Sequence, residues 1–196
     1  MVGIRLDVIN IRMIDMSPLI LWGGTDISPS IYNKRKLKYT QTPDVERDDK
    51  ELFLIDKAIE YKTPIIGVCR GAQLLCAYTG GSLYQHVELQ PMATVDIICS
   101  DGQTRKAKVD HHQVMKPNKD SVTIAWQYLN KPVKAHISDD HAIELQFIPQ
   151  VVYWPKINAI GIQPHPEWMN KTDPFVKWIN LLCHTLLGVN KHVFCN

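Results

Sequence analysis

The amino-acid sequence predicts an α/β fold in which a mostly parallel sheet carries additional antiparallel strands. The first observation is a succession of helix, buried strand, glycine-flanked turn and helix between residues 44 and 81, which is typical of an α/β sheet. The second is a series of short β-branched or aromatic segments between residues 94 and 154, which predicts largely antiparallel strands. No internal repeat or linker is visible, so we expect one domain over residues 1–196.

The first third of that pattern begins with strands and irregular structure. Apolar residues alternate from Val2 to Val8 and then change phase, which predicts a strand with a bulge or a break near residues 8–9. The run "SPLILWGG" at 17–24 predicts a buried strand that enters a loop at its two glycines. The segment "TDISPSIYN" at 25–33 is rich in turn-forming residues and indicates irregular structure.

Three helices and two further buried strands follow in order. Residues 44–62 have apolar side chains at helical spacing and acids in the first turns. The apolar run 63–69 predicts a strand buried in a parallel sheet, and 70–78 predict a helix that two glycines end. Residues 157–168 contain one more strand, which stops at prolines. The last helix, 173–188, has an aspartate as N-cap, a proline at its first position and a glycine as its stop.

Composition excludes several classes of function. A net charge of +2 without a long basic run gives no indication of nucleic-acid binding. No apolar stretch is long enough to span a membrane, and the charged N-terminus does not resemble a signal peptide, so we expect a cytoplasmic protein. The five cysteines are odd in number and widely spaced, which predicts reduced thiols and no structural zinc site.

Cys69 is the first candidate for chemistry. The segment 67–71, "GVCRG", matches the nucleophile-elbow pattern with cysteine in place of serine. A helix that begins at Arg70 points free N–H groups at the sulfur, which lowers a thiol pKa and stabilises an oxyanion. A small core residue is the alternative interpretation, and the pentapeptide alone does not exclude it.

A cysteine nucleophile needs a base, and the base needs a group that orients it. In "GIQPHPEW", His165 and Glu167 flank Pro166 at the end of a predicted strand. At a spacing of two in extended chain, their side chains leave on the same side. A surface turn with a chance histidine and glutamate is the alternative for this segment taken alone.

These two motifs together resemble those of the class I glutamine amidotransferase-like hydrolases. "LILWGGTDISPSIY" precedes them and "GGSLYQH" follows the elbow in the order typical of that superfamily. The string "GG-x-D-x-x-P-x-x-Y" at 23–32 favours the gamma-glutamyl hydrolase branch, which includes gamma-glutamyl-GABA hydrolases. The resemblance extends from about residue 17 to residue 170.

The resemblance implies a flavodoxin-like three-layer sandwich and a Cys–His–Glu triad without metal or cofactor. In this chain Cys69 would be the nucleophile, His165 the general base and acid, and Glu167 the group that orients the imidazole. The oxyanion hole would consist of the N–H of Arg70 and one N–H from the Gly23–Gly24 loop. Residues similar to those around the glutamyl substrate are Gln73, Gly81, Ser82, His112 and Gln113.

The sequence departs from the family pattern twice. Only 22 residues precede Gly23, so the N-terminal strand–helix unit is expected to be shortened. The Asn-Ser pair that often precedes "HHQ" is replaced here in "AKVDHHQ" at 107–113, which affects the expected contacts with the substrate backbone.

The implied activity is hydrolysis of glutamine or a γ-glutamyl-amine through a γ-glutamyl thioester, with release of glutamate. One alternative is a glutaminase subunit that delivers ammonia to a separate synthetase partner. A second is a non-catalytic binding protein on the same fold, which the intact Cys, His and Glu disfavour. A third is a cysteine peptidase or chaperone of the related elbow-cysteine group. In that group the histidine usually lies close behind the cysteine, whereas Arg-Gly-Ala follows Cys69 here.

Overall fold

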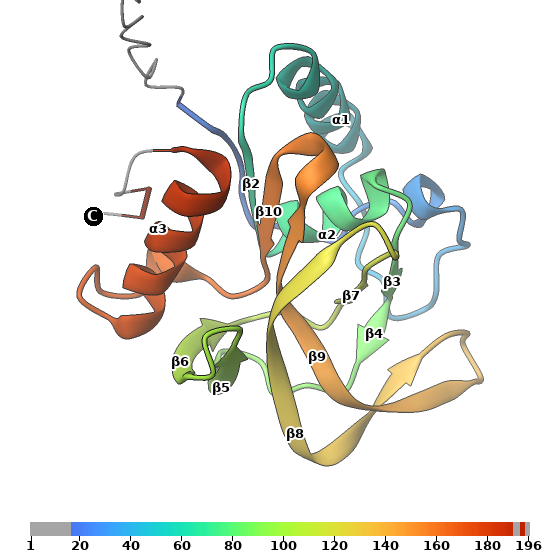
Figure 1. Ribbon diagram of the computed structural model, residues 1–196. Coiled ribbons are helices and arrows are strands. Elements are labelled where there is room, and N and C mark those ends of the chain that lie inside the picture. The colour runs from blue at the N-terminus through green and yellow to red at the C-terminus, as the bar shows by residue number, and fades with distance from the viewer. Residues whose placement is uncertain (1–16, 190–192, 195–196) are drawn as a thin grey trace, which may run out of the picture.

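The computed structural model describes residues 17–189, 193 and 194. The strand and the bulge predicted for the first residues, the shortened N-terminal unit and Cys195 lie outside the described residues. The predicted α/β class is confirmed by one large mixed sheet with helices on both of its faces. Figure 1 shows this arrangement, with α3 on one side of β2 and β10 and with α1 and α2 on the other.

The parallel part of the large sheet consists of β1 (Leu19–Leu21), β2 (Ile65–Val68) and β10 (Ala159–Ile162). Antiparallel strands continue the sheet from β10 in the order β9, β8, β5 and β6, and β4 pairs with β8. Their bounds are Ala142–Trp154, Val122–His136, Ala93–Cys99, Thr104–Val109 and His86–Val87. A separate pair joins β3 (Ser82–Tyr84) to β7 (Val114–Lys116).

Alternation along the buried strands produces the three layers. In β2, Ile65 packs with α1 (Val45–Glu60) and α2 (Arg70–Tyr78), whereas Ile66 and Val68 pack with α3 (Pro174–Leu187). Successive side chains of a strand point to opposite faces, so a strand that is apolar throughout needs cover on both. The hydrophobic runs at 65–68 and 159–162 therefore require the two helical layers.

The three helices have the bounds that their terminal residues predict. The Asp44 side chain caps α1 by accepting from Arg47 N at 3.0 Å. Pro174 begins α3, and Gly188 ends it in the left-handed conformation with φ 72°. Three short 3-10 helices, Pro29–Tyr32, Pro155–Ile157 and Pro166–Trp168, each begin at a proline.

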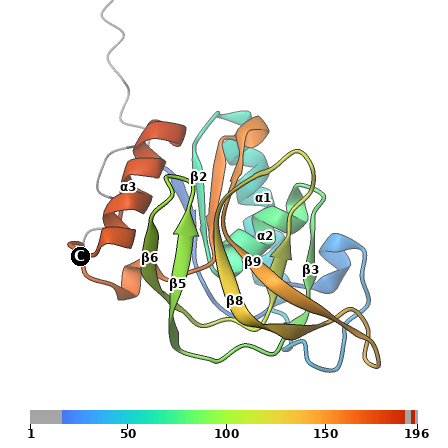
Figure 2. The same cartoon turned by 60° about the horizontal axis from the view of Figure 1, so that its bottom comes forward.

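The long hairpin of β8 and β9 differs from the prediction of several short strands. Figure 2 shows β8 and β9 as two long neighbouring strands. Prolines are typical breaks between strands, but the bounds of each of these strands include one. Pro132 lies in an irregularity of register between Tyr128 and Val133, and Pro149 pairs with Trp126 beside another. A bulge accommodates a residue without an N–H, so the prolines mark bulges here and not strand ends.

Four of the cysteines, Cys69, Cys76, Cys99 and Cys183, are buried free thiols. Within the described ranges, no group of three or more His, Cys, Asp or Glu side chains could hold a metal ion. No helix in that part of the chain has the length and apolarity needed to cross a membrane.

Candidate active site

The predicted catalytic residues follow neighbouring parallel strands at their carboxyl ends. Strand register pairs Leu21 of β1 with Gly67 of β2, and Val68 of β2 with Ile162 of β10. Cys69, directly after β2, donates its N–H to Ile162 O at 2.8 Å. Since the ends of these strands coincide, the loop after β1, the cysteine after β2 and the residues after β10 meet at one edge of the sheet.

Cys69 occupies a strained turn between β2 and α2. Its φ of 50° and ψ of −105° lie in a region that non-glycine residues rarely adopt. A Cβ at position 67 would lie 2.7 Å from the backbone N of Ala72, and one at position 71 would lie 2.7 Å from Leu21 Cβ. The two glycines therefore let strand β2, helix α2 and strand β1 approach one another, and the turn carries Cys69 as the residue before the helix.

The strain predicts an unusual order of stability for substitutions at this position. The free energy of unfolding of Cys69→Gly should equal that of Cys69→Ala or exceed it by up to about 1 kcal/mol. The reason is that glycine adopts the observed φ without strain. At Cys76, in the last turn of α2, glycine should instead be up to about 1 kcal/mol less stable than alanine. Urea unfolding of the four variants measures both differences. The same order at the two positions would contradict the strained geometry.

The Cys69 thiol is buried among polar groups. Its Sγ lies 3.7 Å from Gln163 Nε2, which donates towards it, and 3.9 Å from the carbonyl oxygen of Asp110. Burial raises the pKa of this thiol to about 12, the N–H of Arg70 acts in the opposite direction, and the carboxylates of Glu167 and Asp110 raise it further. The neutral thiol is thus the resting form, so reaction requires a base that removes its proton as it attacks.

His165 has the contacts expected of that base. Its Nδ1 lies 2.7 Å from Glu167 Oε1, and because an ionised carboxylate only accepts, Nδ1 carries the proton and Nε2 is left as the acceptor. Nε2 is buried and has no hydrogen-bond partner among the described residues. The imidazole stacks on the indole of Trp168, with 3.6 Å between the ring centroids and an interplanar angle of 3°. The backbone N–H of His165 donates to Lys108 O at 2.9 Å. These contacts fix the ring and its tautomer.

Gly23 lies against both of the predicted catalytic side chains. A Cβ at this position would be 3.1 Å from His165 Cε1 and 3.6 Å from Cys69 Cβ. The absence of a side chain at residue 23 therefore leaves room for the imidazole and the cysteine on the same side of the loop. The pairing of Cys69 with His165 and of His165 with Glu167, predicted from motifs almost a hundred residues apart, is compatible with this geometry.

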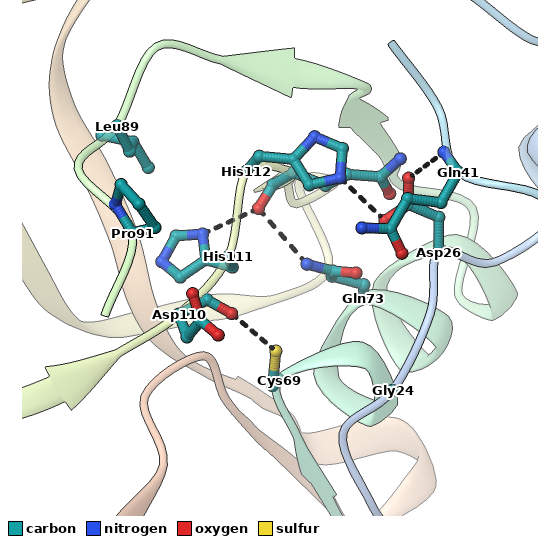
Figure 3. Close-up of a pocket in the computed structure, with 11 residues that line it drawn as sticks. Gly24, Asp26, Gln41, Cys69, Gln73, Leu89, Pro91, Asp110, His111 and His112 are labelled. Atoms are coloured by element: carbon teal, nitrogen blue, oxygen red, sulfur yellow. Dashed lines mark hydrogen bonds and ion pairs between the residues drawn. The ribbon is translucent and has the colours of Figure 1, made fainter. Parts of the chain in front are cut away.

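A cavity of about 400 Å³ opens in front of Cys69. Figure 3 shows the thiol and the Gln73 side chain at its base, with the segment after β6 opposite them and the loop after β1 at its side. The residues that line it are mostly polar: Gly24, Asp26, Gln41, Cys69, Gln73, Leu89, Pro91, Asp110, His111, His112 and Gln113. The Cys69 thiol thus lies at the wall of a polar cavity of a size that suits a small ligand.

Three of the five predicted substrate-binding residues line this cavity. Gln73 Nε2 donates to Gln113 O at 3.2 Å, and His112 Nε2 lies 3.1 Å from Asp26 Oδ1. Neither polar atom of the Gln113 side chain has a partner within the described part of the chain. Gln73, His112 and Gln113 therefore lie where a ligand in the cavity could reach them. Their contact with substrate stays a prediction.

Gly81 and Ser82 lie elsewhere. Ser82 begins β3 and lines a different cavity, and its carbonyl accepts from Cys76 Sγ at 3.5 Å. A Cβ at Gly81 would lie 2.7 Å from Cys76 Sγ and 3.0 Å from Lys116 O, so close packing explains this glycine. Neither residue lines the cavity of Cys69, so the position of this cavity does not support their predicted contact with substrate.

Four further residues at the site were not singled out from the sequence. Gln163 and Trp168 belong to the same "GIQPHPEW" motif as the base, and Asp26 belongs to the glycine loop motif. Their positions inside these motifs were the feature of the sequence that could have identified them as site residues. Asp110 lies in "AKVDHHQ", where the sequence departs from the family pattern, but its place at the cavity depends on the return of β6 to the carboxyl ends of the parallel strands.

Comparisons with known proteins agree with the motifs. The profile of the family described as Peptidase C26 matches residues 7–167. A glutamine amidotransferase-like YvdE homolog of Lactococcus lactis subsp. cremoris is 46% identical over 71 residues, which cover 36% of this chain and 38% of the relative. The gamma-glutamyl-gamma-aminobutyrate hydrolase of Escherichia coli O157:H7 is 36% identical over 67 residues, 34% of this chain and 26% of the relative. The matched stretches thus span well under two thirds of these relatives.

Among solved structures, a glutamine amidotransferase of Thermotoga maritima is similar with a TM-score of 0.46 and 16% identity, covering 71% of this chain and 60% of that one.

Proposed function

Because the chain belongs to the Peptidase C26 family, we propose that it hydrolyses the γ-amide bond of glutamine or of a γ-glutamyl-amine and releases glutamate. The observation that carries the proposal is the meeting of three elements at one edge of the sheet, where Cys69 and Gly24 also line the cavity. These are the strained elbow cysteine, the fixed His165–Glu167 pair at 2.7 Å and the glycine loop after β1. Such a set of nucleophile, oriented base and N–H donors performs acyl transfer.

The reaction begins when Cys69 Sγ attacks the γ-carbonyl carbon and its proton passes to His165 Nε2. The carbonyl electron pair moves to the oxygen, where the N–H of Arg70 and one of the 23–24 loop stabilise the negative charge. The imidazolium gives its proton to the leaving nitrogen as the C–N bond breaks, which leaves a γ-glutamyl thioester. Water then attacks the thioester, His165 accepts one of its protons and returns it to Sγ, and glutamate departs.

The charge of the cavity favours some leaving groups over others. Asp26 and Asp110 contribute carboxylates to its wall, and none of the described residues that line it is lysine or arginine. Asp110 is half-buried, accepts from Met92 N at 3.2 Å and is close enough to Cys69 for its charge to raise the thiol pKa. An anionic cavity attracts cations and repels anions. We therefore expect ammonia or a cationic amine as the leaving group in preference to an amine that carries a carboxylate.

Glutamate release from three substrates tests this expectation. The wild type should hydrolyse glutamine and a γ-glutamyl-diamine with higher kcat/KM than γ-glutamyl-GABA, whose leaving group is anionic. Asp110→Asn should reduce the preference for the diamine over the GABA conjugate by about fivefold, the effect of one partly screened charge. Asp96→Asn, an exposed carboxylate paired with Lys106 on the outer strands, serves as the matched control and should leave the ratio unchanged.

Other outcomes separate the alternatives. Equal preference in the wild type and Asp110→Asn would remove the electrostatic argument for the leaving group. Hydrolysis of glutamine that becomes fast only when a synthetase is added would favour a glutaminase subunit with a partner. No hydrolysis of any γ-glutamyl amide, with or without such a partner, would contradict the proposed activity.

A further inference from the structure

Arg47, in the first turn of α1, donates hydrogen bonds to backbone carbonyl groups of the loop that follows β1. Its Nη2 donates to Trp22 O at 2.9 Å and to Gly23 O at 3.2 Å. Its Nε donates to Glu51 Oε1 at 2.8 Å. The backbone N–H of Arg47 is itself bound by the Asp44 cap, so the guanidinium extends from a fixed helix end. One side chain thus joins the glycine loop to α1.

The Gly23–Gly24 peptide lies between this guanidinium and the catalytic side chains. Gly23 approaches both Cys69 and His165 as closely as described above. At Gly24, an added Cβ would overlap the guanidinium of Arg47, so the arginine packs directly on this residue. Gly24 also lines the cavity together with Cys69. The peptide therefore has Arg47 on one side and the site of reaction on the other.

The contact with Arg47 determines which way this peptide faces. In a trans peptide, the C=O of one residue and the N–H of the next point in opposite directions. Because Gly23 C=O is directed at Arg47, the N–H of Gly24 is directed away from it, towards the side of Cys69 and His165. This N–H takes part in none of the hydrogen bonds found within the described ranges. It is thus free to bind an oxyanion.

Glu51 connects this donor to the other one. Its Oε1 accepts from Arg47, and its Oε2 accepts from the Arg70 guanidinium. Arg70 also donates to Asp48 Oδ1 at 2.5 Å, and both of these side chains are almost fully buried. The backbone N–H of Arg70 is the first predicted donor of the oxyanion hole. The side chains of Arg47 and Arg70, one beside each donor, therefore bind the same carboxylate, that of Glu51.

We propose that Arg47 is a positioning residue that orients the Gly23–Gly24 peptide so that the Gly24 N–H completes the oxyanion hole. Glu51 keeps Arg47 in register with Arg70. This inference rests on the proposed amide hydrolysis, because an oxyanion forms only when a carbonyl is attacked. It identifies Gly24, and not Gly23, as the loop residue that supplies the donor.

Arg47→Gln should lower kcat roughly 10- to 100-fold with little change in KM, because the donor acts on the transition state and not on the bound substrate. Arg47→Lys, which keeps the charge but not the forked donor, should give an intermediate kcat. Alkylation of Cys69 by iodoacetamide forms no oxyanion and should proceed at the wild-type rate in both variants. Lys50→Gln, which breaks an exposed pair with Glu46 one turn along α1, is the control and should match the wild type.

Amide NMR provides a reading that does not depend on turnover. The Gly24 resonance of the wild type should be single and sharp, and in Arg47→Gln it should broaden or shift while resonances of α3 stay unchanged. An unaltered Gly24 resonance, or a wild-type kcat in Arg47→Gln, would overturn the assignment of Arg47. A wild type that shows the expected Gly24 behaviour but hydrolyses no γ-glutamyl amide would contradict the proposed function and leave the positioning of the peptide by Arg47 intact.

Discussion

Replacing Cys69 by alanine should lower kcat for γ-amide hydrolysis roughly 10⁴- to 10⁶-fold, the largest effect of any single substitution in this chain. No other group at the cavity can form the thioester, because Cys69 contributes the one sulfur among the described lining residues. The oxyanion donors and the binding cavity would remain, so substrate should still bind with a similar affinity. Glutamate release by the purified variant measures the loss.

Cys76→Ala is the matched control for that substitution. Cys76 is a second buried thiol on α2, and burial raises its pKa to about 12 as it does that of Cys69. Its Sγ contacts Ser82 O and lies outside the cavity, so the control should lose stability by about 1 kcal/mol and retain activity. Equal activity of Cys69→Ala and Cys76→Ala would contradict the role of Cys69.

Replacing His165 by glutamine should lower kcat roughly 10²- to 10⁴-fold at neutral pH, because the thiol then has no base. A thiol with a pKa of about 12 holds its proton at neutral pH. As long as the pH stays below that pKa, each increase of one pH unit raises the fraction of thiolate tenfold. Residual activity of the variant should therefore keep increasing with pH beyond pH 9. Wild-type activity should reach a plateau instead, because His165 removes the proton from the thiol.

Measurement of kcat/KM from pH 6 to pH 10 distinguishes the two profiles. His141→Gln, at an exposed turn between β8 and β9, is the control and should keep the wild-type profile. If His165→Gln showed the same plateau as the wild type, another group would have to be the base. If the wild type itself rose steadily to pH 10, the thiol would be ionised by solvent and not by His165.

The elbow and its partners could be predicted because their signals are local or follow from strand order. Gly67 and Gly71 bracket a turn whose close contacts, observed at Ala72 and Leu21, only residues without a Cβ permit. The apolar runs before Cys69 and before Pro164 predicted buried strands. Parallel pairing of these strands then brings their carboxyl ends together, although the residues are far apart in sequence.

The remainder depends on contacts that no local pattern encodes. Arg47 and Glu51 look like the acidic and basic residues of any exposed helical turn, and only the packing of α1 on the loop after β1 gives them the carbonyls and the guanidinium that they bind. Asp110 becomes part of the cavity because β6 ends beside the elbow. Gly81 has a packing role against Cys76, which a glycine in the sequence does not distinguish from a substrate-binding one.

The central claim is that Cys69 carries the γ-glutamyl group during turnover. Rapid acid quenching of the wild type with excess substrate, followed by peptide mass spectrometry, tests it directly. The peptide that contains Cys69 should gain the mass of one γ-glutamyl group, the modification should disappear on treatment with hydroxylamine, and Cys69→Ala should never acquire it. Steady glutamate release with no modified cysteine at any quench time, or with the group on a residue other than Cys69, would contradict the account.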